Sequence, residues 1–389
     1  MDYSQKSLAV HEKHKGKIEV VSKISVQNRE DLSIAYTPGV AEPCRKIHDN
    51  KESAYTYTSK GNLVAVVSDG SAVLGLGNIG PDAAMPVMEG KSILFKEFAN
   101  VDAFPICLNT QNVDEIIQAI KWIAPTFGGI NLEDISAPRC FEIENRLKEE
   151  LDIPVFHDDQ HGTAIVVAAG IINALKIVRK RLEDIKVVVN GAGAAGVAIV
   201  KMLLNLGVKN IILCDSKGTI FEGSSDVKYK VEIAKVTNKK SLKGSLKDAL
   251  VGADIFIGVS IANIVTEEMV QSMNKDAIIF GLANPTPEIM PNLALKAGAK
   301  IVGSGRSDFA NQVNNVLAFP GIFRGALDVR AKEINEEMKL AAAYAIADLI
   351  SEEELREDYV IPDAFDKRVV DKIASAVKEA AIASKVNRI

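Results

Sequence analysis

The chain has 389 residues, of which 47% are hydrophobic and 25% are charged, and its formal net charge is −5. This length suits two domains with separate cores, and no basic block or stripe marks a protein that binds nucleic acid. The four cysteines, Cys44, Cys107, Cys140 and Cys214, show no CxxC spacing, so neither a structural zinc site nor a disulfide framework is predicted.

The sequence predicts no targeting or membrane segment. The N-terminus is too polar for a signal peptide and carries acids that a transit peptide avoids. The longest apolar run, residues 164–175, is too short to span a bilayer. These features, with reduced thiols, predict a cytoplasmic protein that has no membrane partner.

The first half of the chain alternates between apolar runs and amphipathic segments. Residues 1 to about 60 are polar with helical patches, and Tyr36 lies there just before a turn at Pro38-Gly39. The alternation that follows predicts an α/β domain with a parallel sheet. Strands are expected over residues 63–67, 103–108, 129–132 and 153–156, and helices over residues 84–98, 113–123 and 141–151.

Acidic side chains follow three of these strands. Asp69 comes after the first, Glu133 and Asp134 after the third, and Asp158 and Asp159 after the fourth. The carboxyl ends of parallel strands meet at one edge of a sheet, where open α/β sheets bind their ligands. Adjacent acids repel each other unless a cation or a proton intervenes, so this edge is the first candidate site.

A metal ion is one interpretation of these acids. Glu133, Asp134 and Asp159 make an all-oxygen set, which suits Mg²⁺ or Mn²⁺ better than zinc. Zinc bound by His157 and His161 is a second interpretation, and surface acids without any metal are a third. The spacing alone leaves all three open.

The second half begins with an apolar segment, residues 163–178, that predicts a buried helix. A strand over residues 185–190 then leads into a glycine fingerprint at Gly191, Gly193 and Gly196, a helix over residues 197–206, and a strand over residues 210–213. Asp215 follows about 20 residues after the last glycine, as in dinucleotide-binding sites. In such sites the glycines let the backbone approach a pyrophosphate at the positive end of the next helix.

The choice of dinucleotide stays open at this point. Asp215 would accept hydrogen bonds from the adenosine ribose and favours NAD, whereas Ser216 and Lys217 suit the 2′-phosphate of NADP. Further strands are expected over residues 254–259, 277–282 and 300–302, followed by a helical tail over residues 331–350 and a capping box from Ser351 to Glu354. These elements predict a second, Rossmann-like domain.

Two residues of the first half are candidates for acid–base catalysis. Lys91 lies in an otherwise small and apolar helical segment, where desolvation or a nearby cation helps a lysine to act as a base. A solvated helix lysine is the more common situation. Tyr36 gains a chemical role only if a site closes over it; otherwise it is a packing residue.

Taken together, the motifs resemble those of malic enzymes of the short bacterial two-domain type. The resemblance covers nearly the whole chain and implies oxidative decarboxylation of L-malate to pyruvate and CO₂, with NAD or NADP and Mg²⁺ or Mn²⁺. The matching stretches are LSIAYTPGVA, VSDGSAVLGLGNIG, MEGKSILFK, GGINLEDI, VFHDDQHGTA, VNGAGAAG, LANPTPE and NQVNNVLAFPG.

The resemblance also implies a role for individual residues. Tyr36 would be the acid that protonates enolpyruvate, Lys91 the base that takes the malate hydroxyl proton, and Asp158 the partner of Lys91. The metal would be held by Glu133, Asp134 and Asp159, and it would act as a Lewis acid. Asn284 and Asn314 would bind substrate. The expected cofactor site comprises Thr163, Asn190, Gly191, Gly193, Ala194, Ala195, Gly196, Asp215, Ser216, Lys217 and Asn315.

Two departures from larger relatives accompany the match. The larger relatives carry an arginine that binds the substrate carboxylate, where this chain has Ser71-Ala72-Val73. Ser71 or backbone amides are expected to replace that arginine. The chain also shows no phosphotransacetylase-like extension, so regulation through such a module is not expected.

The expected architecture is a catalytic domain over residues 1–160, a dinucleotide-binding domain over residues 161–360 and a helical tail over residues 361–389. The family implies a homodimer. Two rival functions remain: a malolactic-type reaction, in which NADH stays bound and reduces pyruvate to lactate, and a dinucleotide sensor with a silent catalytic domain. Retention of Tyr36, Lys91 and the three metal acids disfavours the sensor.

Overall fold

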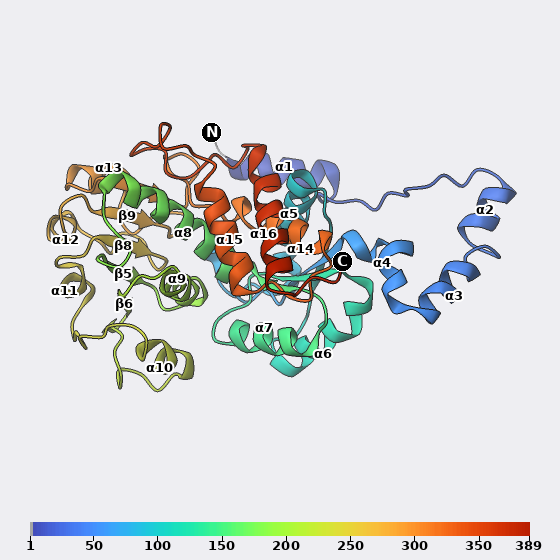
Figure 1. Cartoon of the computed structure of the whole chain (residues 1–389), viewed down its shortest axis with the longest axis horizontal. Helices are drawn as coiled ribbons and strands as arrows, with labels where there is room; N and C mark the ends of the chain where they lie inside the picture. Colours follow the sequence, from blue (N-terminus) through green and yellow to red (C-terminus); the bar gives the residue numbers. More distant parts are fainter. Residues whose placement is uncertain (1–2) are drawn as a thin grey trace.

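The computed structural model describes residues 3–389, apart from the side chain of Leu74. Two β-sheets lie on either side of a central group of helices, and the chain passes from one to the other through α8 (Asp158–Val178) (Figure 1). The structure therefore has the predicted α/β architecture with two sheets of mainly parallel strands.

The first sheet has four parallel strands in the order β2-β1-β3-β4. Their register places Val67 beside Leu132, and Leu132 beside His157. The residues that follow these strands therefore leave the sheet at one edge, as the sequence predicted. The strands are β1 (Leu63–Ser68), β2 (Asp102–Cys107), β3 (Gly129–Leu132) and β4 (Val155–His157).

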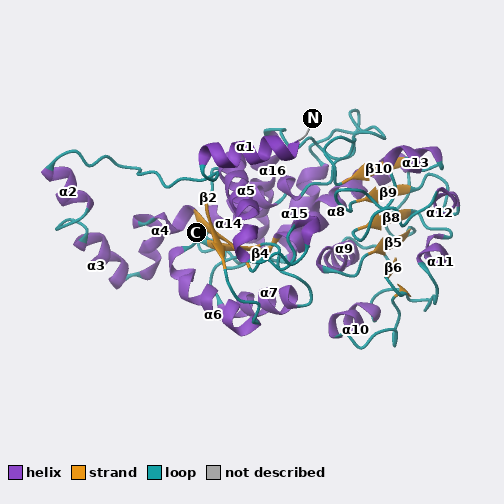
Figure 2. Ribbon diagram, turned by 180° about the vertical axis from the view of Figure 1, so that it is seen from behind, coloured by secondary structure: helices purple, strands orange, loops and turns teal. Residues whose placement is uncertain are grey.

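Helices cover both faces of this sheet (Figure 2). Val64 and Val66 of β1 join the core beneath α5 (Pro81–Ala99), while Ala65 and Val67 face the opposite way. On that second face lie α6 (Val113–Ile123) and α7 (Arg139–Glu150). The alternation is the two-residue period of a strand that is buried on both faces.

Helices from the C-terminal part of the chain complete the first face. Phe319 and Phe323 of α14 (Phe319–Asp328) pack edge-on against Phe95 of α5, with ring centroids 4.7 and 5.2 Å apart. Beside α14 lie α15 (Glu336–Ala347) and α16 (Arg368–Ala383). Segments far apart in sequence thus share one core, and the domain boundaries at residues 160 and 360 stay a prediction.

The second sheet has the order β10-β9-β8-β5-β6-β7, and β7 is its one antiparallel strand. From β5 the chain continues to β6 on one side and later to β8 on the other, which opens a crevice at the carboxyl end of β5. The strands are β5 (Lys186–Asn190), β6 (Asn210–Asp215), β7 (Gly218–Thr219), β8 (Ile255–Gly258), β9 (Ile278–Gly281) and β10 (Ile301–Ser304).

Short helices surround the second sheet, and 3₁₀ turns connect elements elsewhere. The helices are α9 (Ala194–Asn205), α10 (Lys228–Ala234), α11 (Leu246–Leu250), α12 (Glu267–Gln271) and α13 (Pro291–Lys296). The 3₁₀ turns are η1 (Lys51–Ser53), η2 (Ser59–Asn62), η3 (Leu74–Leu76), η4 (Ala124–Thr126) and η5 (Asn315–Leu317).

The linking helix α8 starts earlier than the sequence predicted. It begins at Asp158 rather than at Thr163, so that Asp158 and Asp159 form its first turn, where carboxylates are favoured by the helix dipole. At 21 residues it is also the one helix within residues 3–389 long and apolar enough to cross a membrane by length and composition. Yet 72% of its most apolar window is buried inside the protein, as in a core helix.

An N-terminal arm, residues 18–50, stands away from the rest of the molecule. It follows α1 (Tyr3–His14) and carries α2 (Arg29–Ala35) and α3 (Ala41–Asp49) far from both sheets (Figures 1 and 2). The chain returns to the first sheet through α4 (Ala54–Tyr57). Within the arm, Val20 is 87% exposed and Ile34 is 68% exposed, which a folded surface rarely leaves uncovered.

Candidate active site

The edge of the first sheet holds a buried cluster of charged side chains around Lys91. The Lys91 Nζ lies 2.5 Å from Asp158 Oδ2 and 2.9 Å from Glu133 Oε1. All three side chains are buried, and they come from α5, from the start of α8 and from the residue after β3. The structure thus pairs Lys91 with Asp158 as predicted, and it adds Glu133 to the pair.

The charges of this cluster do not balance. Four carboxylates, those of Glu133, Asp134, Asp158 and Asp159, gather around the one ammonium of Lys91. Burial lowers the pKa of Lys91, but the Asp158 and Glu133 carboxylates outweigh it and raise that pKa above its usual value. Burial also raises the pKa of Asp158 to about 6 and that of Glu133 well above its usual range. The cluster therefore favours further positive charge.

Three of the carboxylates are placed to share one ion. Each of Glu133, Asp134 and Asp159 offers an oxygen, and these oxygens all lie within 4.8 Å of one another. The Asp134 backbone N–H donates to Asp159 Oδ2 at 2.8 Å, which ties the turn after β3 to the start of α8. An all-oxygen set with excess negative charge is the ligand chemistry of a hard divalent cation, so these residues fit Mg²⁺ or Mn²⁺.

Two contacts around Asp158 and Lys91 come from residues that the sequence did not single out. A Cβ added to Gly162 would lie 2.0 Å from Asp158 Oδ1, so the glycine makes room for that carboxylate on the helix surface. Phe319 of α14 places its ring 4.3 Å from Lys91 Nζ, a cation–π contact in a buried place. Both residues lie in matched stretches, VFHDDQHGTA and NQVNNVLAFPG, but each acts only through its contact in the folded chain.

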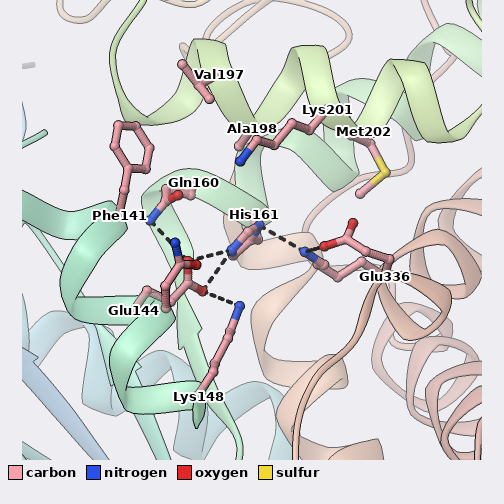
Figure 3. Close-up of a pocket in the computed structure, with 12 residues that line it drawn as sticks. Phe141, Glu144, Lys148, Gln160, His161, Val197, Ala198, Lys201, Met202 and Glu336 are labelled. Atoms are coloured by element: carbon pink, nitrogen blue, oxygen red, sulfur yellow. Dashed lines mark hydrogen bonds and ion pairs between the residues drawn. The ribbon is translucent and has the colours of Figure 1, made fainter. Parts of the chain in front are cut away.

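The two histidines do not form a zinc site. His157 is fully buried at the end of β4. The His161 Nε2 instead lies 2.8 Å from a carboxylate oxygen of Glu144 on α7, so this nitrogen already has a partner (Figure 3). Among residues 3–389, the group of possible metal ligands whose ligand atoms lie close enough to share an ion is Glu133, Asp134 and Asp159.

The glycine fingerprint has the geometry of a dinucleotide loop. Gly191 has a φ of +117°, and a Cβ on Gly196 would lie 1.7 Å from the Gly191 carbonyl oxygen, so both positions need glycine. At Gly193 an added Cβ would meet nothing within 4 Å. Gly193 precedes α9, whose N-terminus suits a phosphate. The open side of this loop is where a pyrophosphate would lie.

Asp215 ends β6 as predicted, but its carboxylate is already bound. It accepts hydrogen bonds from the Lys217 backbone N–H at 2.8 Å and from Lys230 Nζ at 2.6 Å. Burial raises the pKa of Asp215, yet Lys230 and Lys217 outweigh burial and lower it. Lys230, on α10, was not foreseen. By neutralising Asp215 it lowers the repulsion that a 2′-phosphate would meet, so the geometry is compatible with NAD and NADP alike.

Three of the cofactor and substrate candidates, Asn284, Asn314 and Asn315, are placed by local contacts. Asn315 lies against the first turns of α8, since a Cβ on Gly162 would be 3.0 Å from the Asn315 Cβ. Asn284 lies near the loop after β1, because a Cβ on Gly75 would be 3.2 Å from its carbonyl oxygen. Asn314 accepts a hydrogen bond from the Val316 N–H and caps η5. Their contacts with ligands stay predictions.

Sequence comparison agrees with this geometry. Residues 15–148 match the malic enzyme N-terminal domain, and residues 160–382 match the malic enzyme NAD-binding domain. The chain belongs to the malic enzyme family. Its family membership confirms both the two-domain α/β class and the prediction that this protein is an enzyme.

Relatives of known name resemble the chain over nearly its full length. A bifunctional malic/malolactic enzyme of Bacillus subtilis is 63% identical and matches 100% of this chain and 95% of its own. An NAD-dependent malic enzyme of Geobacillus stearothermophilus is 62% identical over 96% of this chain and 78% of its own. The crystal structure of an NAD-dependent malic enzyme from Thermotoga maritima has a TM-score of 0.93 at 54% identity, and the match covers 95% and 98% of the two chains.

Two predicted residues of this malic enzyme family member lie differently from expectation. The Ser71 hydroxyl donates to Asp69 Oδ1 at 2.5 Å and accepts from the Ser136 N–H at 2.9 Å. Its hydrogen bonds therefore stabilise the loop, whereas a substrate contact was expected. Tyr36 is 67% exposed on the N-terminal arm, whereas Lys91 is buried at the first sheet. The chain therefore assembles the lysine, its partner acids and the metal acids, but it does not bring Tyr36 to them.

The contrast between two fingerprint glycines gives a direct test of the dinucleotide loop. We expect Gly193→Ala to fold normally and to weaken NAD and NADP binding about tenfold, because its methyl group would occupy the open side of the loop. Gly196→Ala should instead destabilise the fold by about 3 kcal/mol, since its methyl group would strike the Gly191 carbonyl. Dinucleotide titration and urea unfolding of both variants measure the two effects; equal behaviour of the two variants would contradict this assignment.

Proposed function

We propose that the protein oxidises and decarboxylates L-malate to pyruvate and CO₂, reducing NAD or NADP in the presence of Mg²⁺ or Mn²⁺. The observation that carries the proposal is the buried Lys91, held between Asp158 and Glu133 beside a trio of metal-type carboxylates. An α-hydroxy acid that chelates a hard metal needs such a base at its hydroxyl group. The names of the relatives support the same reaction.

In this proposal Glu133, Asp134 and Asp159 hold the divalent metal. When bound, the metal polarises the substrate hydroxyl and stabilises negative charge as CO₂ departs. Lys91 would take the hydroxyl proton, and a bound NAD or NADP would supply the acceptor for the hydride. Cancelling the charge of the surrounding carboxylates lowers the pKa of Lys91 towards the range of a base, because those carboxylates are what raise it. Asp158 accepts a hydrogen bond from Lys91 and orients its amine.

The reaction is tested by following NADH and NADPH formation from L-malate with Mn²⁺, for wild type and for Lys91→Ala. We expect reduced cofactor and pyruvate in the wild type and a loss of at least about a hundredfold in the variant. The ratio of the two wild-type rates gives the cofactor preference. Formation of lactate without released NADH would favour the malolactic reaction, which the name of the Bacillus subtilis relative includes. Dinucleotide binding without turnover of malate would support the rival function of a dinucleotide sensor with a silent catalytic domain.

The charge of the metal acids predicts how metal binding depends on pH. Asp158, with its folded-state pKa raised from 3.8 to about 6, binds a proton more readily in the folded than in the unfolded chain. Without metal, its contribution to stability is thus present at low pH and is lost as pH rises from about 4 to 6. Burial also raises the pKa of the metal acid Glu133, and protons on Glu133 and its neighbour Asp158 reduce the negative charge that attracts Mn²⁺. Mn²⁺ should therefore raise the melting temperature more near pH 7.5 than near pH 5.

The control for this measurement is the triple variant Glu133→Gln, Asp134→Asn, Asp159→Asn, which keeps the size of the side chains and removes their charge. It should show no Mn²⁺ response at either pH. A Mn²⁺ shift of equal size in the control and in the wild type would place the ion elsewhere.

We also propose that the working unit is a homodimer in which Tyr36 completes the site of the other subunit. Three observations support this. Tyr36 is exposed and directly follows α2, which stands on the arm away from α5, the helix that carries Lys91. The arm exposes a series of apolar side chains that a single chain leaves in water, namely Val20, Val21, Ile24, Val26, Leu32 and Ile34. A hollow of about 560 Å³ between α2 and α3 is lined by Ile34, Pro38, Pro43 and Tyr57.

A twofold arrangement explains these observations together. Each arm would cover its apolar residues against the other subunit and carry its tyrosine there, because a twofold axis makes the exchange reciprocal. Burial of the arm supplies the hydrophobic stabilisation that it lacks alone. The phenol of Tyr36 would then be the acid that protonates enolpyruvate.

Heterodimers with two different affinity tags test the exchange. A purified dimer of one Tyr36→Phe chain and one Lys91→Ala chain contains one intact site if Tyr36 acts across the interface, so it should have about half of wild-type activity. If both residues act within one chain, the same dimer is inactive.

The matched control reverses the outcome. A dimer of a wild-type chain with a Tyr36→Phe, Lys91→Ala double variant has no intact site under exchange and one intact site without it. Activity in this control, together with inactivity of the first heterodimer, would overturn the exchange while leaving the malic enzyme reaction in place.

A further inference from the structure

A second charged cluster lies behind the active site, centred on Glu144 of α7. This carboxylate is 3% exposed and accepts hydrogen bonds from His161 Nε2 at 2.8 Å, Gln160 Nε2 at 3.3 Å and the His157 backbone N–H at 3.3 Å. Figure 3 shows Glu144 facing His161 and Gln160, with Lys148 approaching it from the same helix. A small cavity of about 110 Å³ adjoins the group.

The partners of His161 fix its tautomer. A carboxylate can only accept, so the nitrogen 2.8 Å from Glu144 carries the proton. The other nitrogen, Nδ1, accepts from Lys339 Nζ of α15 at 3.3 Å. An ammonium can only donate, so Nδ1 carries no proton and the ring is neutral. Lys339 is paired in turn with Glu336, which accepts from Asn205 at the end of α9.

Besides Lys148, Glu144 binds three groups that lie on either side of the catalytic acids in sequence. His157 comes immediately before Asp158, and Gln160 comes immediately after Asp159. The N-terminus of α8 has no side-chain cap of its own, since His157 accepts no backbone N–H there. A helix end without a local cap needs partners from elsewhere, and Glu144 supplies one from α7.

Stability alone does not account for a buried carboxylate at this place. Burying Glu144 costs desolvation energy, and a well-packed apolar side chain of similar volume is commonly as good for stability. What an apolar residue cannot do is bind the backbone N–H before Asp158 and the side chains that follow Asp159. Directional hydrogen bonds of this kind set the position and rotation of the first turn of α8.

We propose that Glu144 is a positioning residue that fixes the first turn of α8, and thereby Asp158 and Asp159, through its bonds to His157, Gln160 and the Nε2-protonated His161. The proposal rests on the proposed function, because it assumes that Asp159 binds the metal. In this proposal Glu144 does not bind the metal itself; it positions Asp159, which does. Lys339 of α15 contributes by holding His161 in the Nε2–H tautomer.

The test compares Glu144→Gln with Glu149→Gln, a matched change at an exposed position of the same helix. In Glu144→Gln one acceptor oxygen remains and the other becomes an amide N–H₂, so the new side chain is neutral and cannot accept from both His161 and Gln160 as the two carboxylate oxygens do. We expect Mn²⁺ to bind about tenfold more weakly to Glu144→Gln than to wild type, measured on free protein by the electron paramagnetic resonance of unbound Mn²⁺.

Two further readouts separate positioning from general damage. The chain has five histidines, so ¹⁵N-histidine spectra can show the His161 tautomer. It should be Nε2–H in wild type, and the Nε2 resonance should shift only in Glu144→Gln, where the acceptor loses its charge. NAD affinity should be unchanged in both variants, and Glu149→Gln should match wild type throughout. If Glu144→Gln does not fold, His161→Ala replaces it, with an expected loss of Mn²⁺ affinity of about threefold.

The outcomes are distinguishable from those of the proposed function. Wild-type protein that binds no Mn²⁺ would refute the metal role, and the proposal about Glu144 would fall with it. Wild-type protein that binds Mn²⁺, with Glu144→Gln binding it equally well, would refute the positioning role alone. An Nδ1–H tautomer of His161 in wild type would also overturn the positioning role.

Discussion

The excess of negative charge at the edge of the first sheet is the constraint on which the rest of the structure depends. Four carboxylates share this edge with a single lysine, and burial prevents water from screening them. Such an arrangement costs free energy in an empty protein, and it is relieved by protons or by a cation. The fold concentrates these acids where the carboxyl ends of β1, β3 and β4 meet, and α8 begins there.

The helix α8 connects this charge to the second sheet. Its first turn carries Asp158 and Asp159, its next turn carries Gly162 and Thr163, and its apolar remainder lies in the core that both halves share. The loop with Asn314 and Asn315 lies against the same turns. A dinucleotide bound at the glycine loop and a substrate bound at the acids would therefore approach each other across one rigid element.

Much of this arrangement could be predicted from sequence, because its signals are local. Apolar runs that end in acids indicated the strands of the first sheet, and the glycine fingerprint with Asp215 indicated the centre of the second. The remainder depends on contacts between residues that are distant in sequence. Phe319 reaches Lys91 from another part of the chain, Lys230 neutralises Asp215 from a short helix, and Glu144 acts on the start of α8 from α7. The exposure of Tyr36 was not foreseeable either, since a motif does not show where its loop lies.

The most direct measurement of the central claim is anomalous diffraction from crystals of the protein grown with Mn²⁺. The account predicts one strong peak at coordination distance from Glu133, Asp134 and Asp159, with Lys91 still beside Asp158. A peak at another place, or none while these carboxylates stay as close together as they are, would show that the charge of this edge is balanced in another way and would contradict the assignment of the active site.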